Sequence, residues 1–375
     1  LIPINHGSPP MADSKLIPVT MPKWGLSMKE GKVTGWLVED GAAVKPGDAI
    51  LEIETDKIAG SVEAAEPGVL RRVGATDTMY PVKTLLGVIA DPSVPQSEID
   101  AFVGSYIVPV GEDGEDDGPK FEFAEVDGLK LRYSKTGDSG DAVIMIHGFG
   151  GDLGSWMFNV DALAEGATVY ALDLPGHGQS TKRIDDPSIA GLAKEVSGFM
   201  DAVGVTAAHF VGHSLGGAIS AQLAATAPDR VKSITLIGSA ALGPDINIDY
   251  ISGFVSAPSR RELKPVLELL FADAGQVNRA MVDDILKFKR LDGATEALTT
   301  LAGGVFPDGR QAKVLADAVK AGKTRSLLLH GADDKIIPSS HTAALGGTVM
   351  AGGSHMLHME QANAVNAAIK KHIGG

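Results

Sequence analysis

The sequence predicts two folded regions of different class. Residues 15–90 predict an all-β unit, and residues 121–375 predict an α/β unit with a doubly wound, mostly parallel sheet. Three observations predict this division. Short alternating apolar runs fill the first region, strand-like and helix-like stretches alternate in the second, and an acidic stretch rich in Pro and Gly separates them. A period of two residues indicates strands, and strands spaced by helices indicate parallel pairing.

The composition narrows the classes of partner. The chain has 375 residues with a formal net charge of −14, so it lacks the basic stripe that nucleic-acid binding requires. It contains no cysteine, so any thiol chemistry must come from a cofactor or a substrate, and we expect no metal site. No apolar run reaches the roughly 18 residues of a membrane span, so we expect no membrane partner. No signal peptide is visible, which makes the cytoplasm the expected location.

The all-β region repeats itself. The stretches at 35–53 and 68–89 share a glycine, an apolar pair, a second glycine, a proline and a closing apolar run. Weak internal symmetry of this kind is typical of a duplicated β unit, folded as a flattened barrel or sandwich. Lys57 falls between the two copies, at the turn of the hairpin that joins them. An exposed lysine often serves only solubility, but this position at the midpoint of the repeat favours attachment of a cofactor.

The next region, 91–120, changes in character. It is rich in Pro, Gly and acidic residues, and its segment GEDGEDDG offers nothing to bury. We predict a flexible linker with a short helical turn at 97–103.

The region after 121 predicts a parallel sheet with an inserted lid. Apolar strands are expected at 143–146, 168–172, 207–211, 231–237 and 325–329, with amphipathic helices between them. The rhythm breaks between 240 and 318, where three helical stretches follow one another without a strand. We therefore expect a helical lid over 240–318.

The segment HFVGHSLGGAIS, with Ser214 at its centre, fits the pattern G-x-S-x-G between a strand and a helix. Such a turn needs small neighbours because the backbone is strained and closely packed. It lifts the serine hydroxyl above the sheet and places the amide of Leu215 at a helix N-terminus, where it can stabilise an oxyanion. Ser214 is therefore the candidate nucleophile.

A serine nucleophile needs a base and an acid. The loop AGGSHMLHME offers His355 and His358, and the turn ADDKIIP after a predicted strand offers Asp333 and Asp334. For the remaining candidates, His147, His177, His213, His330 and His341, we expect structural roles, and strand alternation predicts that His213 points away from the site. The loop in VIMIHGFGG places the amide of Phe149 as a second oxyanion donor.

Several of these segments resemble known families. The stretch ETDKI around Lys57 resembles the lipoyl domain of 2-oxo-acid dehydrogenase complexes over about 75 residues. Biotin carriers share that fold but usually flank their lysine with methionines, so the resemblance implies lipoate on Lys57. One departure is the turn in MYPVKT, where Lys83 stands in place of the family's usual glycine.

The later motifs, including DLPGHGQS, follow the order of the α/β-hydrolases. Their pattern G-x-x-D before an apolar pair and Pro selects Asp334, and G-x-x-H selects His355. The resemblance therefore implies a triad of Ser214, Asp334 and His355.

The combination of both halves resembles the dihydrolipoyllysine-residue acetyltransferases of acetoin dehydrogenase systems. It implies acetyl transfer from the lipoyl group to coenzyme A. It also implies two partner enzymes, a thiamine-diphosphate acetoin dehydrogenase component and a dihydrolipoamide dehydrogenase. The H-x-x-x-D-G motif of the usual acyltransferase core is missing.

Three questions stay open at this level. Transfer can proceed through an acyl-serine or directly to coenzyme A. The alternative function is a thioesterase or carboxylesterase tethered to such a complex. Cationic residues of the lid could serve coenzyme A phosphates, although such residues are more often simply solvated. They are Arg260, Arg261, Lys264, Lys287, Lys289 and Arg290.

Overall fold

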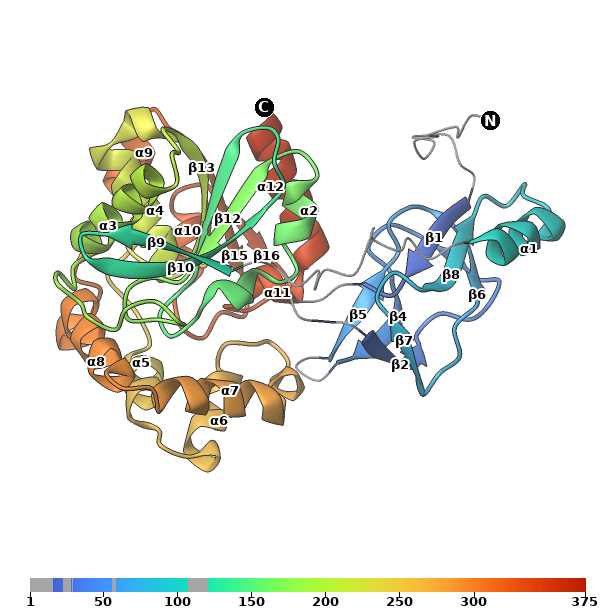
Figure 1. The fold of residues 1–375 in the computed structure, drawn as a ribbon, viewed down its shortest axis with the longest axis horizontal. Helices are drawn as coiled ribbons and strands as arrows, with labels where there is room; N and C mark the ends of the chain where they lie inside the picture. Colours follow the sequence, from blue (N-terminus) through green and yellow to red (C-terminus); the bar gives the residue numbers. More distant parts are fainter. Residues whose placement is uncertain (1–15, 23–27, 29, 56–58, 107–120) are drawn as a thin grey trace, which may run out of the picture. The chain divides into compact units, whose positions relative to one another are not determined.

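The computed structural model describes residues 16–22, 28, 30–55, 59–106 and 121–375 (Figure 1). The described residues form two compact units, a β unit within 16–106 and an α/β unit over 121–375. Lys57 lies outside the described residues.

The β unit consists of two four-stranded sheets. One has the order β1-β8-β6-β3 and the other β5-β4-β2-β7. The sequence repeat explains why these orders match, because β4, β2 and β7 of one sheet correspond to β8, β6 and β3 of the other. The strands are β1 (Leu16–Thr20), β2 (Glu30–Trp36), β3 (Ala43–Val44), β4 (Ala49–Glu54), β5 (Ala59–Glu63), β6 (Gly68–Arg72), β7 (Thr78–Pro81) and β8 (Leu85–Ala90).

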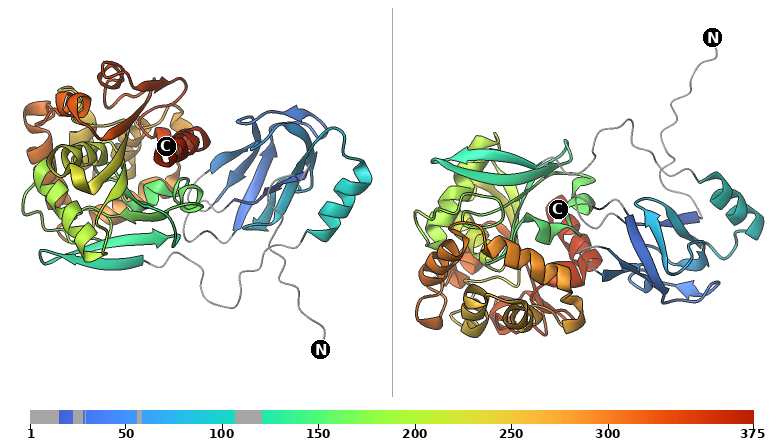
Figure 2. Two further views of the ribbon diagram at one scale, coloured as in Figure 1. Left: turned by 90° about the horizontal axis from the view of Figure 1, so that it is seen from above. Right: turned by 60° about the horizontal axis from the view of Figure 1, so that its bottom comes forward.

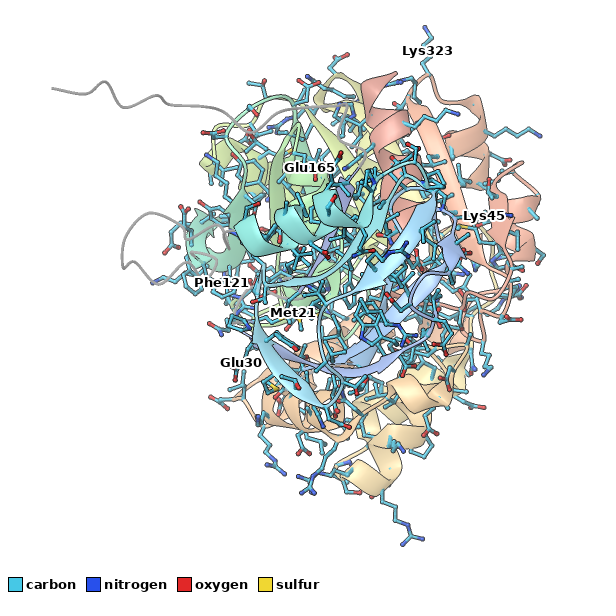
Figure 3. The ribbon with its side chains drawn as sticks, turned by 90° about the vertical axis from the view of Figure 1, so that its right-hand side faces the viewer. Met21, Glu30, Lys45, Phe121, Glu165 and Lys323 are labelled. Carbon is cyan, nitrogen blue, oxygen red and sulfur yellow. The ribbon has the colours of Figure 1, made fainter. Side chains whose placement is uncertain are left out.

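Alternation along the strands of the β unit separates a core from a solvated surface. Val33, Ile53 and Leu70 are fully buried, whereas Glu30 and Lys45, labelled in Figure 3, are exposed. Lys83 has a φ of 70°, the left-handed conformation that favours glycine. Lys83 therefore adopts a conformation that glycine takes up more easily than a residue with a side chain.

Part of the predicted linker is folded. Helix α1 (Gln96–Ser105) packs against β8 and buries Ile99, and Gln96 accepts a hydrogen bond from Arg71. The flexible linker that we expected to begin at 91 therefore does not begin there. A longer helix than the predicted turn forms because Ile99 has the β unit to pack against. Residues 107–120 lie outside the described residues.

The α/β unit is built on one eight-stranded sheet of order β16-β15-β14-β13-β11-β12-β10-β9. Figure 2 shows the ribbon of this unit from two further sides. The strands from β16 to β12 are parallel, and β10 and β9 add an antiparallel edge. Phe121, labelled in Figure 3, begins the edge strand and is 44% exposed. The strands are β9 (Phe121–Val126), β10 (Leu129–Thr136), β11 (Ala142–Ile146), β12 (Thr168–Leu172), β13 (Ala208–His213), β14 (Val231–Ile237), β15 (Arg325–Gly331) and β16 (Thr348–Met350).

Helices cover both faces of this sheet (Figure 1). On β11, Ile144 and Ile146 face the core beneath α3 and α4, whereas Val143 and Met145 face the core beneath α2 and α12. Outside the lid, the helices are η1 (Leu153–Trp156), α2 (Val160–Ala164), α3 (Ile189–Ala202), α4 (Leu215–Thr226), η2 (Pro228–Arg230), α9 (Ala316–Ala321), α10 (Ser340–Ala343), α11 (Leu357–Glu360) and α12 (Ala362–Gly374).

The lid is a group of four helices between β14 and β15. Contacts between α5 and α6, α6 and α7, α7 and α8, and α5 and α8 close the group on itself. The predicted last lid helix, α9, packs instead against α4. The lid therefore ends before the expected limit at 318. Its elements are α5 (Ile248–Ser256), α6 (Arg260–Glu268), η3 (Ala274–Gln276), α7 (Arg279–Lys289), α8 (Ala294–Val305) and η4 (Pro307–Gly309).

Candidate active site

Ser214 lies in a strained turn between β13 and α4. Its φ of 52° and ψ of −114° are unusual for a residue with a side chain, and its amide donates to the carbonyl of Ile237 at 3.0 Å. A Cβ on Gly212 would collide with the backbone of Gly216, and one on Gly217 would collide with Ser239. Close packing therefore explains why glycines surround the serine.

Asp334 is the acidic residue that contacts His355. Its Oδ2 lies 2.8 Å from Nδ1 of His355, and its side chain is fully buried, whereas Asp333 is exposed. The imidazole Nδ1–H donates to the carboxylate, which leaves Nε2 with its lone pair available as a base. Oδ1 of Asp334 accepts from the amides of Ile336 and Ile337 at 2.8 and 3.0 Å.

A second imidazole, His330, also faces Asp334. Its Nε2 lies 2.9 Å from the same Oδ2, and its Nδ1 lies 2.8 Å from the hydroxyl of Thr342. Burial alone would raise the pKa of Asp334. Attraction to His355, with hydrogen bonds from His330 and His355, outweighs burial and holds that pKa well below its usual range. Asp334 therefore stays ionised beside His355.

The serine turn and the His355 loop are neighbours in the fold. Gly238 directly follows Ile237, which binds the amide of Ser214, and a Cβ on Gly238 would lie 3.4 Å from Nδ1 of His355. His213 donates from Nε2 to the carbonyl of His355 at 2.9 Å. The prediction that His213 points away from the site is wrong, because its ring centroid lies 4.7 Å from that of His355. Ser214 and His355 are only 5% and 2% exposed.

Two backbone amides near Ser214 are available to an oxyanion. Within the described parts of the chain, neither the amide of Phe149 nor that of Leu215 has a hydrogen-bond acceptor. A Cβ on Gly148 would lie 3.0 Å from Cβ of Ser214, so the loop that carries Phe149 approaches the serine closely. This proximity fits the two donors of an oxyanion hole.

Two histidines hold the Phe149 loop, as we expected of residues with structural roles. His147 accepts from the amide of Leu174 at 3.0 Å, and His177 accepts from the amide of Gly150 at 3.1 Å. Burial holds the pKa of both rings below the usual value, so both stay neutral.

The sequence analysis missed a buried ion pair beneath this loop. Arg132 and Asp173 pair at 2.7 Å, and Asp173 also accepts from the amides of Leu153 and Gln179. One carboxylate thus ties the loop after β11 to the loop after β12. Asp173, the first residue of the motif DLPGHGQS, could have pointed to this ion pair. The sequence alone did not indicate its partner Arg132, which lies 41 positions away.

The lid covers the site and is tied to it. Phe149 contacts Phe254 of α5 and Phe306, with ring centroids 6.0 Å apart in each pair. Glu360 bridges the lid and the His355 loop, since it accepts from the amides of Ala272 and Ser354 at 2.7 and 2.6 Å. The two loops and the lid therefore enclose Ser214.

Among the described residues, no group of three or more His, Asp or Glu side chains could hold a metal ion. The described helices include none that is both long and apolar enough to cross a bilayer.

Comparisons with known proteins agree with both halves of the chain. Residues 17–89 match the family described as biotin-requiring enzymes, and residues 141–362 match the α/β hydrolase fold. A protein of Cupriavidus necator named dihydrolipoyllysine-residue acetyltransferase component of acetoin cleaving system is 51% identical over 96% of this chain and 98% of its own length. A protein of the same name from Pseudomonas putida is 44% identical over 96% of this chain and all of its own.

The chain belongs to this acetyltransferase family. Its resemblance to the family, inferred from the motifs, is confirmed, and so is the combination of a lipoyl domain with an α/β-hydrolase fold. Among solved structures, a meta-cleavage product hydrolase from Pseudomonas fluorescens matches 68% of this chain and 97% of its own, with a TM-score of 0.62. At 23% sequence identity, this likeness concerns the fold alone.

Proposed function

We propose that this protein transfers an acetyl group from S-acetyldihydrolipoyl-lysine to coenzyme A within an acetoin-cleaving complex. The observation that carries the proposal is the His355–Asp334 pair beside the strained turn of Ser214. A base, a fixed acid and a lifted hydroxyl are the parts that acyl transfer requires. The names of the two full-length relatives support the choice of acetyl group and complex.

Lys57 is the residue that would hold lipoate. The strands on either side of it in the sequence, β4 and β5, pair antiparallel down to Glu54 and Ala59, so Lys57 falls within the four residues that join them. A hairpin connection fits the group because it can present a long side chain without a surrounding pocket. When bound, lipoate supplies the thiol on which the acetyl group arrives as a thioester.

In the first half of the reaction, His355 takes the proton from Oγ of Ser214 as the oxygen attacks the acetyl carbonyl. Asp334 keeps the imidazole in the tautomer that leaves Nε2 free and stabilises the imidazolium that forms. The amides of Phe149 and Leu215 stabilise the oxyanion. The C–S bond then breaks, and the imidazolium returns its proton to the leaving thiolate.

In the second half, the thiol of coenzyme A attacks acetyl-Ser214 with His355 as base, and Ser214 regains its proton. A direct route uses the same residues without an acyl-serine, with His355 acting on coenzyme A itself. The partners expected for this function are the thiamine-diphosphate acetoin dehydrogenase component and dihydrolipoamide dehydrogenase. We place this reaction in the cytoplasm.

A second function, hydrolysis by a tethered thioesterase or carboxylesterase, uses the same three side chains. The fold shared with hydrolases supports it, because transfer and hydrolysis differ in acceptor and not in triad. Transfer is favoured because the lid and loops leave Ser214 only 5% exposed, and exclusion of water suppresses hydrolysis.

The test measures both products from acetyl-dihydrolipoamide at saturating coenzyme A. We expect acetyl-coenzyme A to dominate, and acetate as the main product would return the protein to the hydrolases. Ser214→Ala and His355→Ala should each lower the rate by roughly 10⁴-fold or more, since triad members act as a unit. Asp334→Asn should lower it by about 10⁴-fold, whereas the exposed neighbour in Asp333→Asn provides a matched control with little effect.

A further inference from the structure

A groove of about 460 Å³ lies on the lid between the start of α6 and the end of α7. Four cationic side chains line it, Arg260, Arg261, Lys287 and Arg290, against a single carboxylate, Asp283. This gathering of positive charge stands out because the whole chain has a net charge of −14. The groove therefore offers a local positive potential on an otherwise acidic protein.

Two of the four cations are not neutralised inside the protein. Arg260 pairs with Asp283, and Lys287 pairs with Asp284 at 2.8 Å. Arg261 and Arg290 have no ion-pair partner within the described ranges. The groove thus keeps two guanidinium groups, which present several N–H donors to a phosphate at once.

The stability of the helices does not explain the placement of the arginines of α6. The first turn of a helix is the positive end of its dipole, so cations there are disfavoured. Arg260 and Arg261 are nevertheless the first two residues of α6. Asp283 accounts for the position of Arg260, whereas within the described ranges no carboxylate pairs with Arg261.

A second hollow adjoins the groove on the lid. This hollow of about 220 Å³ shares Pro258, Leu286 and Arg290 with the first and is also lined by Lys289. The Lys289 ammonium lies 5.8 Å from the ring centroid of Phe254, and that ring packs on Phe149. Lys289 and Phe254 therefore connect the lining of the second hollow to the loop that carries Phe149.

We propose that this lid groove binds the phosphorylated nucleotide end of coenzyme A, with Arg261 and Arg290 contacting its phosphates. The inference rests on the proposed function, which requires a thiol acceptor. Coenzyme A joins a polyanionic nucleotide to a thin arm that ends in a thiol. The groove takes the anionic end, and the arm runs past Phe254 toward Ser214.

Direct binding tests the groove without relying on catalysis. Isothermal titration of the full chain with coenzyme A, and with adenosine 3′,5′-bisphosphate as a fragment, gives two dissociation constants. Arg261→Gln combined with Arg290→Gln should weaken both by about tenfold or more, the usual cost of losing charge-assisted phosphate contacts. Lys313→Gln combined with Lys320→Gln, exposed lysines outside the groove, removes the same charge and should change either constant less than twofold.

Catalysis separates this proposal from the proposed function. With pantetheine, which has the thiol arm but no phosphate, the Arg261/Arg290 variant should match the unmodified protein. With coenzyme A it should show a KM raised about tenfold at similar kcat. An equal rise in KM for pantetheine and coenzyme A in the Arg261/Arg290 variant would contradict the proposed binding site. Unchanged binding of coenzyme A to that variant would contradict it as well. If the unmodified protein binds coenzyme A in the groove but produces only acetate, the proposed acetyl transfer is wrong. The proposed coenzyme A site is then still supported.

Discussion

His358 lies three residues after His355 but has a different environment. Its ring is fully buried, with centroids 4.5 Å from Trp156 and 4.6 Å from His213. Burial, with His355 nearby, lowers the pKa of His358 to about 3. The ring therefore remains neutral in the folded protein across a wide acidic range.

This pKa links His358 to the pH dependence of stability. Below pH 6.5 the unfolded chain takes up a proton at this side chain, whereas the folded chain does so only near pH 3. The free energy of unfolding consequently falls as the pH is lowered through this window, by up to about 1.4 kcal/mol per pH unit from this group. His358→Phe should reduce that slope. Urea unfolding at pH 7 and pH 5, followed by helical circular dichroism, measures it, and equal slopes in both proteins would contradict the assignment.

The residues of the site differ in how far sequence could predict them. Ser214, Asp334 and His355 lie in local motifs whose order is informative, and the structure places the last two in contact. The partner of Asp173, Arg132, lies 41 positions away, and no local pattern encodes such a pairing, so it became visible only in the fold. His330 lies only four residues before Asp334, but the sequence analysis assigned it a structural role and did not pair the two.

At the scale of elements, Glu360 connects α11 to the lid. Its two carboxylate oxygens accept from amides on opposite sides of the site, Ala272 in the lid and Ser354 before the histidine. Glu360→Ala removes both bonds and should loosen the lid over Ser214. We expect the ratio of acetate to acetyl-coenzyme A to rise severalfold, because water then reaches the acyl-enzyme.

The control for this prediction is Glu296→Ala, which removes an exposed lid carboxylate on α8. Its product ratio should stay that of the unmodified protein. If Glu360→Ala leaves the ratio of acetate to acetyl-coenzyme A as unchanged as the control does, the Glu360 carboxylate contributes to folding alone and not to the exclusion of water.

Element boundaries were harder to predict than element order. The repeat at 35–53 and 68–89 predicted a duplicated β unit, and the structure has two β-sheets with matching strand orders. The alternation of strands and helices after 121 predicted a parallel sheet. Helix α1 was underestimated because its acidic and Pro-rich surroundings hide one buried residue, Ile99. Helix α9 reads like the lid helices, since an amphipathic pattern shows that a face is buried but not against which partner.

At the scale of the whole molecule, each unit has its own buried core. Val33, Ile53 and Leu70 are buried in the β unit, and the sheet of the α/β unit lies between two further cores. In our proposal, the two units have different roles in acetyl transfer. One unit would carry the acetyl thioester on Lys57, and the other would move the acetyl group from Ser214 to its acceptor.

The folding of α1 onto the β unit shortens the connection that the sequence predicts between the two. We propose that residues 107–120 act as a tether. A chain of that length spans at most about 50 Å when fully extended, and on the order of 20 Å as a flexible coil. A tether of this reach gives the lysine of one unit an effective concentration near the other unit in the millimolar range.

Separating the units should therefore cost turnover without damaging the site. When residues 1–106 and 121–375 are produced apart and mixed at micromolar concentration, we expect transfer from the acetylated β unit to fall by up to about a thousandfold, the ratio of millimolar to micromolar concentrations. Free acetyl-dihydrolipoamide should react at the same rate with the separate α/β unit as with the intact chain, which controls for its folding. Raising the loaded β unit toward millimolar concentration should restore the rate. Equal rates for the linked and the dilute separate units would mean that the connection contributes nothing to delivery, and that the two units recognise each other through a surface of their own.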